Sequence, residues 1–155
     1  MAWLASQFVG VRELGHNAGP IVERFQKSVD GRAVGEPWCA CFVQYCVREV
    51  APIVASTPTL FPTESTQLLW AHTPTSARVA AEPGAIVVWR SKAKPLTGHC
   101  GIVSRVDGED IVTIEGNTGA GDQREGDVVA VKHRIGGQIP GFELLGFLRP
   151  FEESK

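Results

Sequence analysis

The stretch that decides the fold runs from residue 35 to residue 50 and reads GEPWCACFVQYCVREV. Proline is favoured at the first helical position, where its missing N–H costs nothing, so we predict that a helix begins at Pro37. Apolar residues then recur at steps of three and four, which is typical of a helix with one buried face. These residues are Cys39, Phe42, Val43, Cys46, Val47 and Val50. We expect Pro52 to end this helix, which is largely buried and carries Cys39 in its first turn.

Shorter helical patterns lie on both sides of this segment. The first is an apolar stripe near the N-terminus, and we expect it to form a helix up to residue 14. Its members are Trp3, Leu4, Phe8, Val11 and Leu14. A second helix is expected from Pro20 to Val29, with turn residues at Asp30-Gly31, and a brief third one from Ser65 to Ala71.

Beyond residue 80 the apolar pattern becomes that of strands separated by turn residues. The expected strands are Ala85–Trp89, His99–Val106, Asp110–Glu115, Val128–Arg134 and a last one near Gly146–Arg149. Helices followed by an antiparallel sheet indicate an α+β fold, with the N-terminal helices packed on the sheet. The length of 155 residues suits one domain that spans the whole chain.

Composition and charge exclude several classes of protein. The chain is 43% hydrophobic with a formal net charge of −2, and no basic cluster of the nucleic-acid-binding type is present. No apolar run approaches the roughly 18 residues that a membrane span needs. The N-terminus lacks the basic region of a signal peptide, so we expect no classical secretion signal. A target outside the cytoplasm would then need another delivery route, for which release by phage lysis and export as secretion-system cargo are both open.

The four cysteines fit free thiols better than disulfides or zinc. Cys39, Cys41 and Cys46 share one predicted helix, where such spacings do not suit disulfide geometry. The spacing Cys-x-Cys-x4-Cys is also unusual for structural zinc, and no histidine lies at a matching offset. We therefore expect no metal and no cofactor.

Cys39 is the candidate nucleophile because of its place near a helix N-terminus. The N–H groups there lack partners within the helix, and the helix dipole adds positive charge. Both effects favour a thiolate and should lower the pKa of Cys39. The N–H of Cys39 can also donate to an oxyanion, whereas the sequence identifies no second donor. Trp38, beside the nucleophile, is a candidate for lining the substrate cleft.

A thiolate of this kind needs a proton-handling partner, and His99 has the most suitable setting of the four histidines. It lies between Gly98 and Gly101 at the start of an apolar strand, where backbones and substrate can approach closely. The next strand ends with Glu115 and Asn117, either of which could orient the imidazole. We favour Glu115, because a carboxylate stabilises an imidazolium better than an amide does.

Four segments, in this order along the chain, resemble the cysteine, histidine-dependent amidohydrolase/peptidase family, or CHAP domain. They are Gly35–Val43, Glu82–Trp89, Gly98–Val103 and Ile114–Asn117. The resemblance is to the catalytic modules of phage endolysins and bacterial autolysins, and it implies a papain-like fold and activity on cell-wall peptidoglycan. It also implies roles for four residues: Cys39 as nucleophile, His99 as base and Glu115 as the third member, with Asn117 close by.

The chain also departs from the family pattern. Ala85 stands where an aspartate is usual, and Cys100 stands where valine or alanine is commoner. Some members bind calcium through an acidic loop before the nucleophile, but this stretch offers only Asp30 and Glu36, so we predict no calcium site.

The expected function is therefore that of a monomeric, bacteriolytic peptidoglycan hydrolase acting on the cell wall. It would be an N-acetylmuramoyl-L-alanine amidase or an endopeptidase, and the sequence does not choose between these two bonds. Two alternatives are a transferase or amidase that acts on another amide, and a non-catalytic wall-binding module with the same fold.

Overall fold

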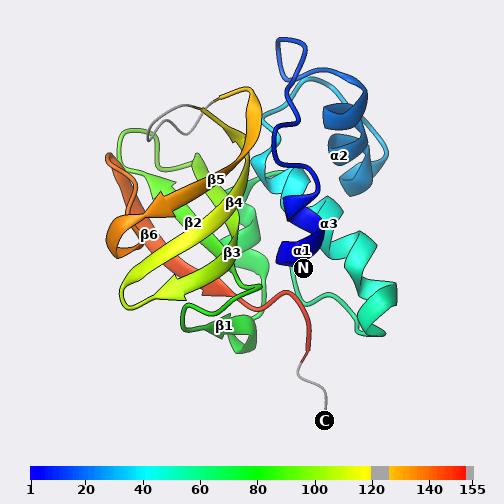
Figure 1. Cartoon of the computed structure of the whole chain (residues 1–155). Helices are drawn as coiled ribbons and strands as arrows, with labels where there is room; N and C mark the ends of the chain where they lie inside the picture. Colours follow the sequence, from blue (N-terminus) through cyan, green and yellow to red (C-terminus); the bar gives the residue numbers. More distant parts are fainter. Residues whose placement is uncertain (120–125, 153–155) are drawn as a thin grey trace.

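The computed structural model describes residues 1–119 and 126–152. It consists of helices on one side of a six-stranded sheet, which confirms the expected α+β class (Figure 1). The strands are β1 (Arg78–Val79), β2 (Ile86–Ser91), β3 (Gly98–Asp107), β4 (Asp110–Thr118), β5 (Val128–Arg134) and β6 (Phe142–Leu148). All neighbouring strands are antiparallel, in the order β1-β6-β2-β3-β4-β5.

Four α-helices and two short 3-10 helices accompany the sheet in the described part of the chain. They are α1 (Ala2–Ser6), α2 (Pro20–Asp30), α3 (Cys39–Val54), α4 (Thr66–His72), η1 (Thr75–Ala77) and η2 (Ile135–Gly137). The central helix α3 packs on β3 and β4, α2 packs on α3, and α4 packs on β2 and β3. None of the helices within residues 1–119 and 126–152 is long and apolar enough to cross a membrane.

The predictions for α2 and α4 are confirmed, because both helices carry strong end signals. Pro20 is the first residue of α2, and Gly31 ends the helix in the left-handed conformation at φ 86°. In α4 the hydroxyl of Ser65 accepts a hydrogen bond from the N–H of Leu68 at 3.3 Å, which is a standard N-terminal cap.

The prediction of a helix up to residue 14 is wrong beyond the first turns. Helix α1 ends at Ser6, and Gly10 then adopts φ 92°, which an α-helix does not allow. The chain instead runs beside β5, where the N–H of Gly10 donates to the carbonyl of Val129 at 2.9 Å. Leu14, counted in the apolar stripe, is 80% exposed.

Helix α3 is buried as expected, but both predicted ends are wrong. The first helical residue is Cys39 and the N-cap is Trp38, so Pro37 lies just outside the helix. At the other end Pro52 lies inside the helix, which continues to Val54. Proline is tolerated there because only the last turn follows it, so few hydrogen bonds are lost.

The sheet has two buried faces of different character. The face toward α3 is part of the main apolar core and carries Ile86, Val88, Cys100, Ile102 and Ile114. The opposite face contributes to a smaller apolar cluster with Ala85, Val87, Trp89, Val103 and Ile111. Because side chains alternate along a strand, the neighbours of the first set point to the second face. His99 and Glu115 are such neighbours, and both are fully buried.

Candidate active site

Cys39 is the first residue of α3, at the end of the helix where backbone N–H groups have no acceptor within the helix. Its side chain is 5% exposed and contributes to the wall of a cavity of about 240 Å³. The cavity is lined by Glu36, Pro37, Cys39, Glu64, Ser65, Thr66, Leu96, Thr97 and Gly98. The sulfur is therefore at the positive end of a buried helix and is reachable from the cavity.

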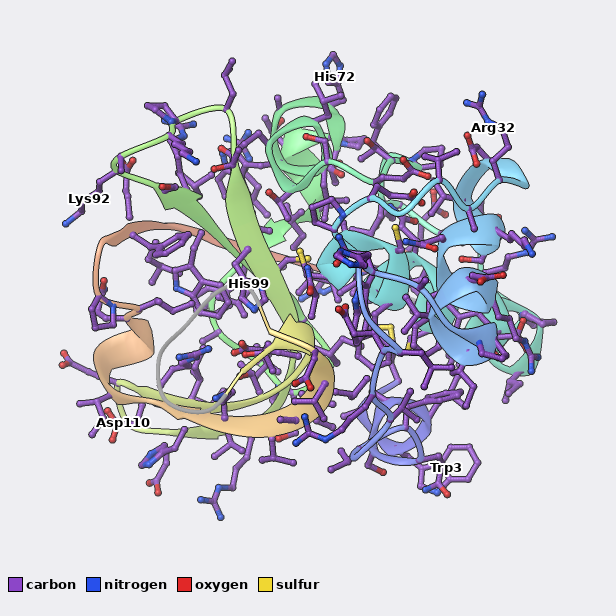
Figure 2. All side chains as sticks on the ribbon, turned by 90° about the horizontal axis from the view of Figure 1, so that it is seen from above. Trp3, Arg32, His72, Lys92, His99 and Asp110 are labelled. Carbon is purple, nitrogen blue, oxygen red and sulfur yellow. The ribbon has the colours of Figure 1, made fainter. Side chains whose placement is uncertain are left out.

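His99 lies near the start of β3 with no exposed surface, and Figure 2 shows it in the interior while Trp3, His72 and Lys92 point outward. Its Nε2 atom is 2.8 Å from Oε2 of Glu115 on the neighbouring strand β4. Trp89 of β2, directly opposite His99 in the sheet, stacks on the imidazole with ring centroids 5.9 Å apart. These two contacts hold the plane and the direction of the ring.

The second ring nitrogen of His99, Nδ1, is the one that Glu115 does not contact. It is buried and has no hydrogen-bond partner of standard geometry among the described residues, while the Cys39 side chain does interact with the ring. Since Glu115 occupies Nε2, we infer that the Cys39 contact falls to Nδ1. Burial alone would lower the pKa of His99, but hydrogen bonds with Cys39 and Glu115, and their negative charges, raise it to about 9.

Glu115 is fully buried, and both its carboxylate oxygens accept hydrogen bonds. Oε1 accepts from the Thr113 hydroxyl at 2.6 Å and from Nε of Arg134 at 2.9 Å, while Nη2 of Arg134 donates to Oε2 at 2.6 Å. Burial by itself raises the pKa of this carboxyl, but the charges and hydrogen bonds of His99 and Arg134 outweigh it and lower the pKa to about 2. Glu115 is therefore a carboxylate at neutral pH.

The sulfur, the imidazole and the carboxylate thus lie in the order that covalent catalysis requires of a nucleophile, a base and an orienting group. The family model described as CHAP domain matches residues 31–117, which is more than half of the chain. The chain belongs to the CHAP family. CHAP domains are hydrolases of the amidase or peptidase type whose substrate is related to peptidoglycan. No curated protein and no solved structure gives a significant match to the chain.

Glycines make room for this CHAP site at two points of close approach. A Cβ atom on Gly101 of β3 would lie 2.6 Å from Cγ of Glu115, so the glycine lets the carboxylate pass over β3 to reach His99. A Cβ on Gly116 of β4 would lie 2.8 Å from Cβ of Phe42, so this second glycine lets α3 pack close to the sheet. One glycine serves the polar face and the other serves the helix face.

Asn117, the other residue considered for orienting the imidazole, follows a different path. The register of β4 and β5 shifts between Glu115 and Thr118, and Asn117 has a positive φ of 53°. A bulge of this kind ends the regular alternation, so Asn117 does not continue the face of Glu115. Its side chain contributes to a second cavity, with Glu13 and Pro37 among its walls. Within the described residues no hydrogen bond joins Asn117 to His99, whose Nε2 partner is Glu115.

Trp38 lies in the core, which corrects the expectation that it lines the cleft of this CHAP domain. The side chain has no exposed surface and is not among the residues around the cavity at Cys39. Its ring packs 5.9 Å from Phe25, and its Nε1 donates to Oε2 of Glu13 at 3.0 Å. Trp38 therefore supports the start of α3, which carries Cys39.

The other three cysteines, Cys41, Cys46 and Cys100, are buried free thiols, which confirms the expectation of free thiols. Burial is the main cause that raises the pKa values of Cys41 and Cys46. For Cys100 a hydrogen bond with the Cys39 side chain, followed by burial, raises the pKa well above its usual range. These three thiols are thus protonated at neutral pH and are poor nucleophiles.

Three side chains near the cavity at Cys39 could offer ligand atoms to a metal ion. Those of Glu36, Cys41 and Glu64 lie within 4.8 Å of one another. Calcium, which some CHAP domains bind, takes six to eight oxygen ligands, so a set with one thiol and two carboxylates does not fit it. Burial and the charge of Glu36 raise the pKa of Glu64.

Sequence reasoning missed Arg134 and Glu64 in the surroundings of the site. Arg134 ends the run Lys132-His133-Arg134, which has the composition of a solvated strand end, yet its side chain is 1% exposed. Its position opposite Ile111 in the β4–β5 register is the signal that places it on the face of Glu115. That register could not be read from the sequence alone, because the alternation of residues along one strand does not say which residue of the neighbouring strand lies opposite.

Proposed function

We propose that the chain is a peptidoglycan hydrolase that cleaves amide bonds through a Cys39–His99–Glu115 triad and a thioester intermediate. The observation that carries this proposal is the position of Cys39 at the N-terminus of α3 beside an imidazole that Glu115 holds at 2.8 Å. A helix N-terminus, a buried imidazole and an ionised carboxylate together favour a thiolate–imidazolium pair.

The reaction follows from the roles of these groups. The Cys39 thiolate attacks the carbonyl carbon of the substrate amide, and the N–H of Cys39 donates to the oxyanion that develops. The His99 imidazolium gives its proton to the leaving amine, and the neutral imidazole then takes a proton from the water that hydrolyses the thioester. Glu115 keeps the ring oriented and stabilises its charged form throughout.

The cleaved bond is either the amide between the glycan and the stem peptide or a peptide bond of the stem or crossbridge. Digestion of purified sacculi of several wall types, followed by mass spectrometry of the soluble products, distinguishes these bonds. An amidase releases free stem peptides, whereas an endopeptidase leaves peptide fragments on the muramic acid. New crosslinks in place of new free amines would identify a transferase.

The direct test replaces the nucleophile. Cys39→Ala should lower the rate of peptidoglycan hydrolysis by roughly four to six orders of magnitude, as in other triads. Cys46→Ala is the matched control, because it removes a buried thiol from the same helix without touching the site. If Cys39→Ala keeps more than about a tenth of the wild-type activity, Cys39 is not the nucleophile.

Alkylation separates the proposed enzyme from a non-catalytic module of the same fold. Iodoacetamide near neutral pH should modify Cys39 far faster than Cys41, Cys46 or Cys100, because only thiolates react at an appreciable rate. Peptide mapping after short exposures measures each site. Slow and equal labelling of all four thiols would contradict an activated Cys39.

A further inference from the structure

The side chain behind Glu115 is an arginine buried as deeply as the triad itself. The side chain of Arg134 is 1% exposed and donates hydrogen bonds to both carboxylate oxygens of Glu115. Nε lies 2.9 Å from Oε1, and Nη2 lies 2.6 Å from Oε2. Such paired, charge-assisted hydrogen bonds fix both the position and the orientation of a carboxylate. Oε2 of Glu115 thus meets both Nη2 of Arg134 and Nε2 of His99, while Oε1 accepts from Nε of Arg134.

The sheet explains how Arg134 reaches this position. Arg134 pairs with Ile111 across β4 and β5, and Ile111, Thr113 and Glu115 alternate onto the same face of β4. The guanidinium therefore extends along that face toward Glu115 and lies 5.7 Å from the ring centre of Trp89. Since Trp89 also stacks on His99, one tryptophan packs against both the imidazole and the guanidinium.

The groups around His99 come from five elements, and three of these, α3, β4 and β5, supply groups that can carry a charge. Cys39 of α3 and Glu115 of β4 act on the ring directly, and Arg134 of β5 acts through Glu115. Cys100 of β3 is a neutral thiol at neutral pH. The ammonium of Lys132 of β5 donates a hydrogen bond to the carbonyl of Gly119. Trp89 of β2 carries no charge.

These charges have a simple balance. The negative charge of Glu115 is already offset by Arg134, and both are buried, where an unbalanced charge is costly. A protonated His99 adds one positive charge to this buried group. The group is neutral again only when Cys39 carries a negative charge.

From this geometry we propose that Arg134 is a positioning residue: it holds Glu115 toward His99 and offsets its charge, so that the proton on His99 is retained chiefly by the Cys39 thiolate. Without Arg134, the negative charge of Glu115 would stabilise a protonated His99 even when the Cys39 thiol is neutral. The proton of His99 would then no longer be transferred together with the change of charge at Cys39. The proposal deepens the proposed function and rests on its assignment of Cys39 and His99.

The test measures the titration of His99 in proteins that lack the nucleophile. NMR spectra of ring-labelled histidine are recorded against pH for Cys39→Ala and for the double variant Cys39→Ala/Arg134→Met. We expect the pKa of His99 to be about one to three units higher in the double variant, because Glu115 then faces the ring as an unbalanced carboxylate. His16, His72 and His133 serve as internal references in the same spectra.

The matched control is Cys39→Ala/Arg149→Met, which removes an arginine that pairs with Glu82 at 2.9 Å, away from His99. It should leave the titration of His99 unchanged. An unchanged pKa of His99 in the Arg134→Met double variant would overturn the proposal. The result is independent of hydrolysis, so a chain that fails to cut peptidoglycan can still pass or fail this test.

The lysine variant keeps the test decisive if methionine prevents folding. In Cys39→Ala/Arg134→Lys the charge is kept, so the pKa of His99 should stay within about half a unit of that in Cys39→Ala. In the protein that retains Cys39, Arg134→Lys removes the paired hydrogen bonds to the two oxygens of Glu115. It should lower kcat about 10- to 100-fold with little change in KM. An upward pKa shift or full activity with lysine would each contradict the proposal.

Discussion

The two faces of the central sheet bury side chains of opposite chemistry within a few residues of each other. On the α3 side, Cys100, Ile102 and Ile114 join a broad apolar core. On the other side, His99 and Glu115 alternate with these same residues and form a chain of hydrogen bonds that ends at Arg134. In β3 and β4, residues of one face thus pack in the main core, while the alternating residues of the other face include His99 and Glu115.

This difference decides how each face responds to substitution. Apolar contacts are many and weak, so a lost methylene costs a moderate amount and its neighbours adjust. Hydrogen bonds between buried charged groups are few and directional, and removal of one partner leaves the other without compensation. The helix face should therefore tolerate changes that the polar face does not.

Among the variants that compare the two faces of the sheet, Glu115→Gln on the polar face should have the largest effect. It should lower kcat/KM by about 10³- to 10⁴-fold, because a neutral amide neither fixes the tautomer of His99 nor stabilises its charge. It also leaves Arg134 buried without its carboxylate, at a cost of about 3–5 kcal/mol in the free energy of unfolding. Kinetics on solubilised peptidoglycan and urea denaturation measure the two losses.

Asn117→Ala is the comparison for Glu115→Gln, because Asn117 lies two residues from Glu115 in β4 but, owing to the bulge, does not share the face of the sheet that carries Glu115. We expect a much smaller loss of kcat/KM than for Glu115→Gln. The reverse ranking would transfer the orienting role to Asn117.

Two glycine variants set the faces against each other directly. In Gly101→Ala the new methyl meets Glu115 Cγ at 2.6 Å, and a displaced carboxylate should lower kcat about 100-fold. In Gly116→Ala the methyl meets Phe42 at 2.8 Å and Trp38 at 2.9 Å, which should cost about 1–3 kcal/mol of stability. Activity and unfolding measured on both proteins should therefore rank them in opposite orders; the same order in both would show that the faces are not separable.

The dependence of stability on pH should arise on the polar face. The pKa of Glu115 is lowered from 4.5 to about 2, so its contribution is present above pH 4.5 and is lost as the pH falls toward 2. A shift of this size is worth about 3 kcal/mol. The pKa of His99 is raised from 6.5 to about 9, so its contribution is present below pH 6.5 and is lost as the pH rises through 9. Denaturation of wild type and Glu115→Gln at several pH values checks this, and equal acid sensitivity of the two would contradict it.

The smallest expected effect is that of Ile102→Val on the helix face. One methylene is lost from a fully buried site, which should cost about 0.5–1.5 kcal/mol. The pH profile of kcat/KM should stay where it is, since Ile102 points away from His99. A shifted profile would show that packing on this face also sets the position of the imidazole.

The sequence predicted the fold where its periodic patterns carried their own end signals. Pro20 and Gly31 bound α2 as expected, and the apolar runs of β2 to β5 lie close to their predicted positions. The N-terminal stripe failed because Gly10 turned the chain toward β5, and backbone pairing there outweighed helical spacing. Strand β1, with two residues, is too short to leave a pattern.

For the site, the sequence supplied the residues but not the partners that tune them. Cys39, His99 and Glu115 stand in motifs, and the structure brings them together. Arg134 has no local signal, because a buried arginine is recognisable only from the carboxylate that it meets. The prediction that Trp38 lines the cleft failed for a related reason. Trp38 precedes Cys39 in the sequence, but this adjacency does not determine the direction of its ring, which is buried.

The sealed position of His99 has a consequence for solvent exchange. His99 has no exposed surface and Glu115 occupies its Nε2, whereas Cys39 interacts with the ring and lines the cavity. We therefore expect the ring to exchange with bulk water past Cys39, through that cavity. A substrate fragment lodged in that cavity would close this route. Deuterium uptake at the imidazole should then slow markedly, so the isotope exchange rate of a single ring reports occupancy even when no bond is cut.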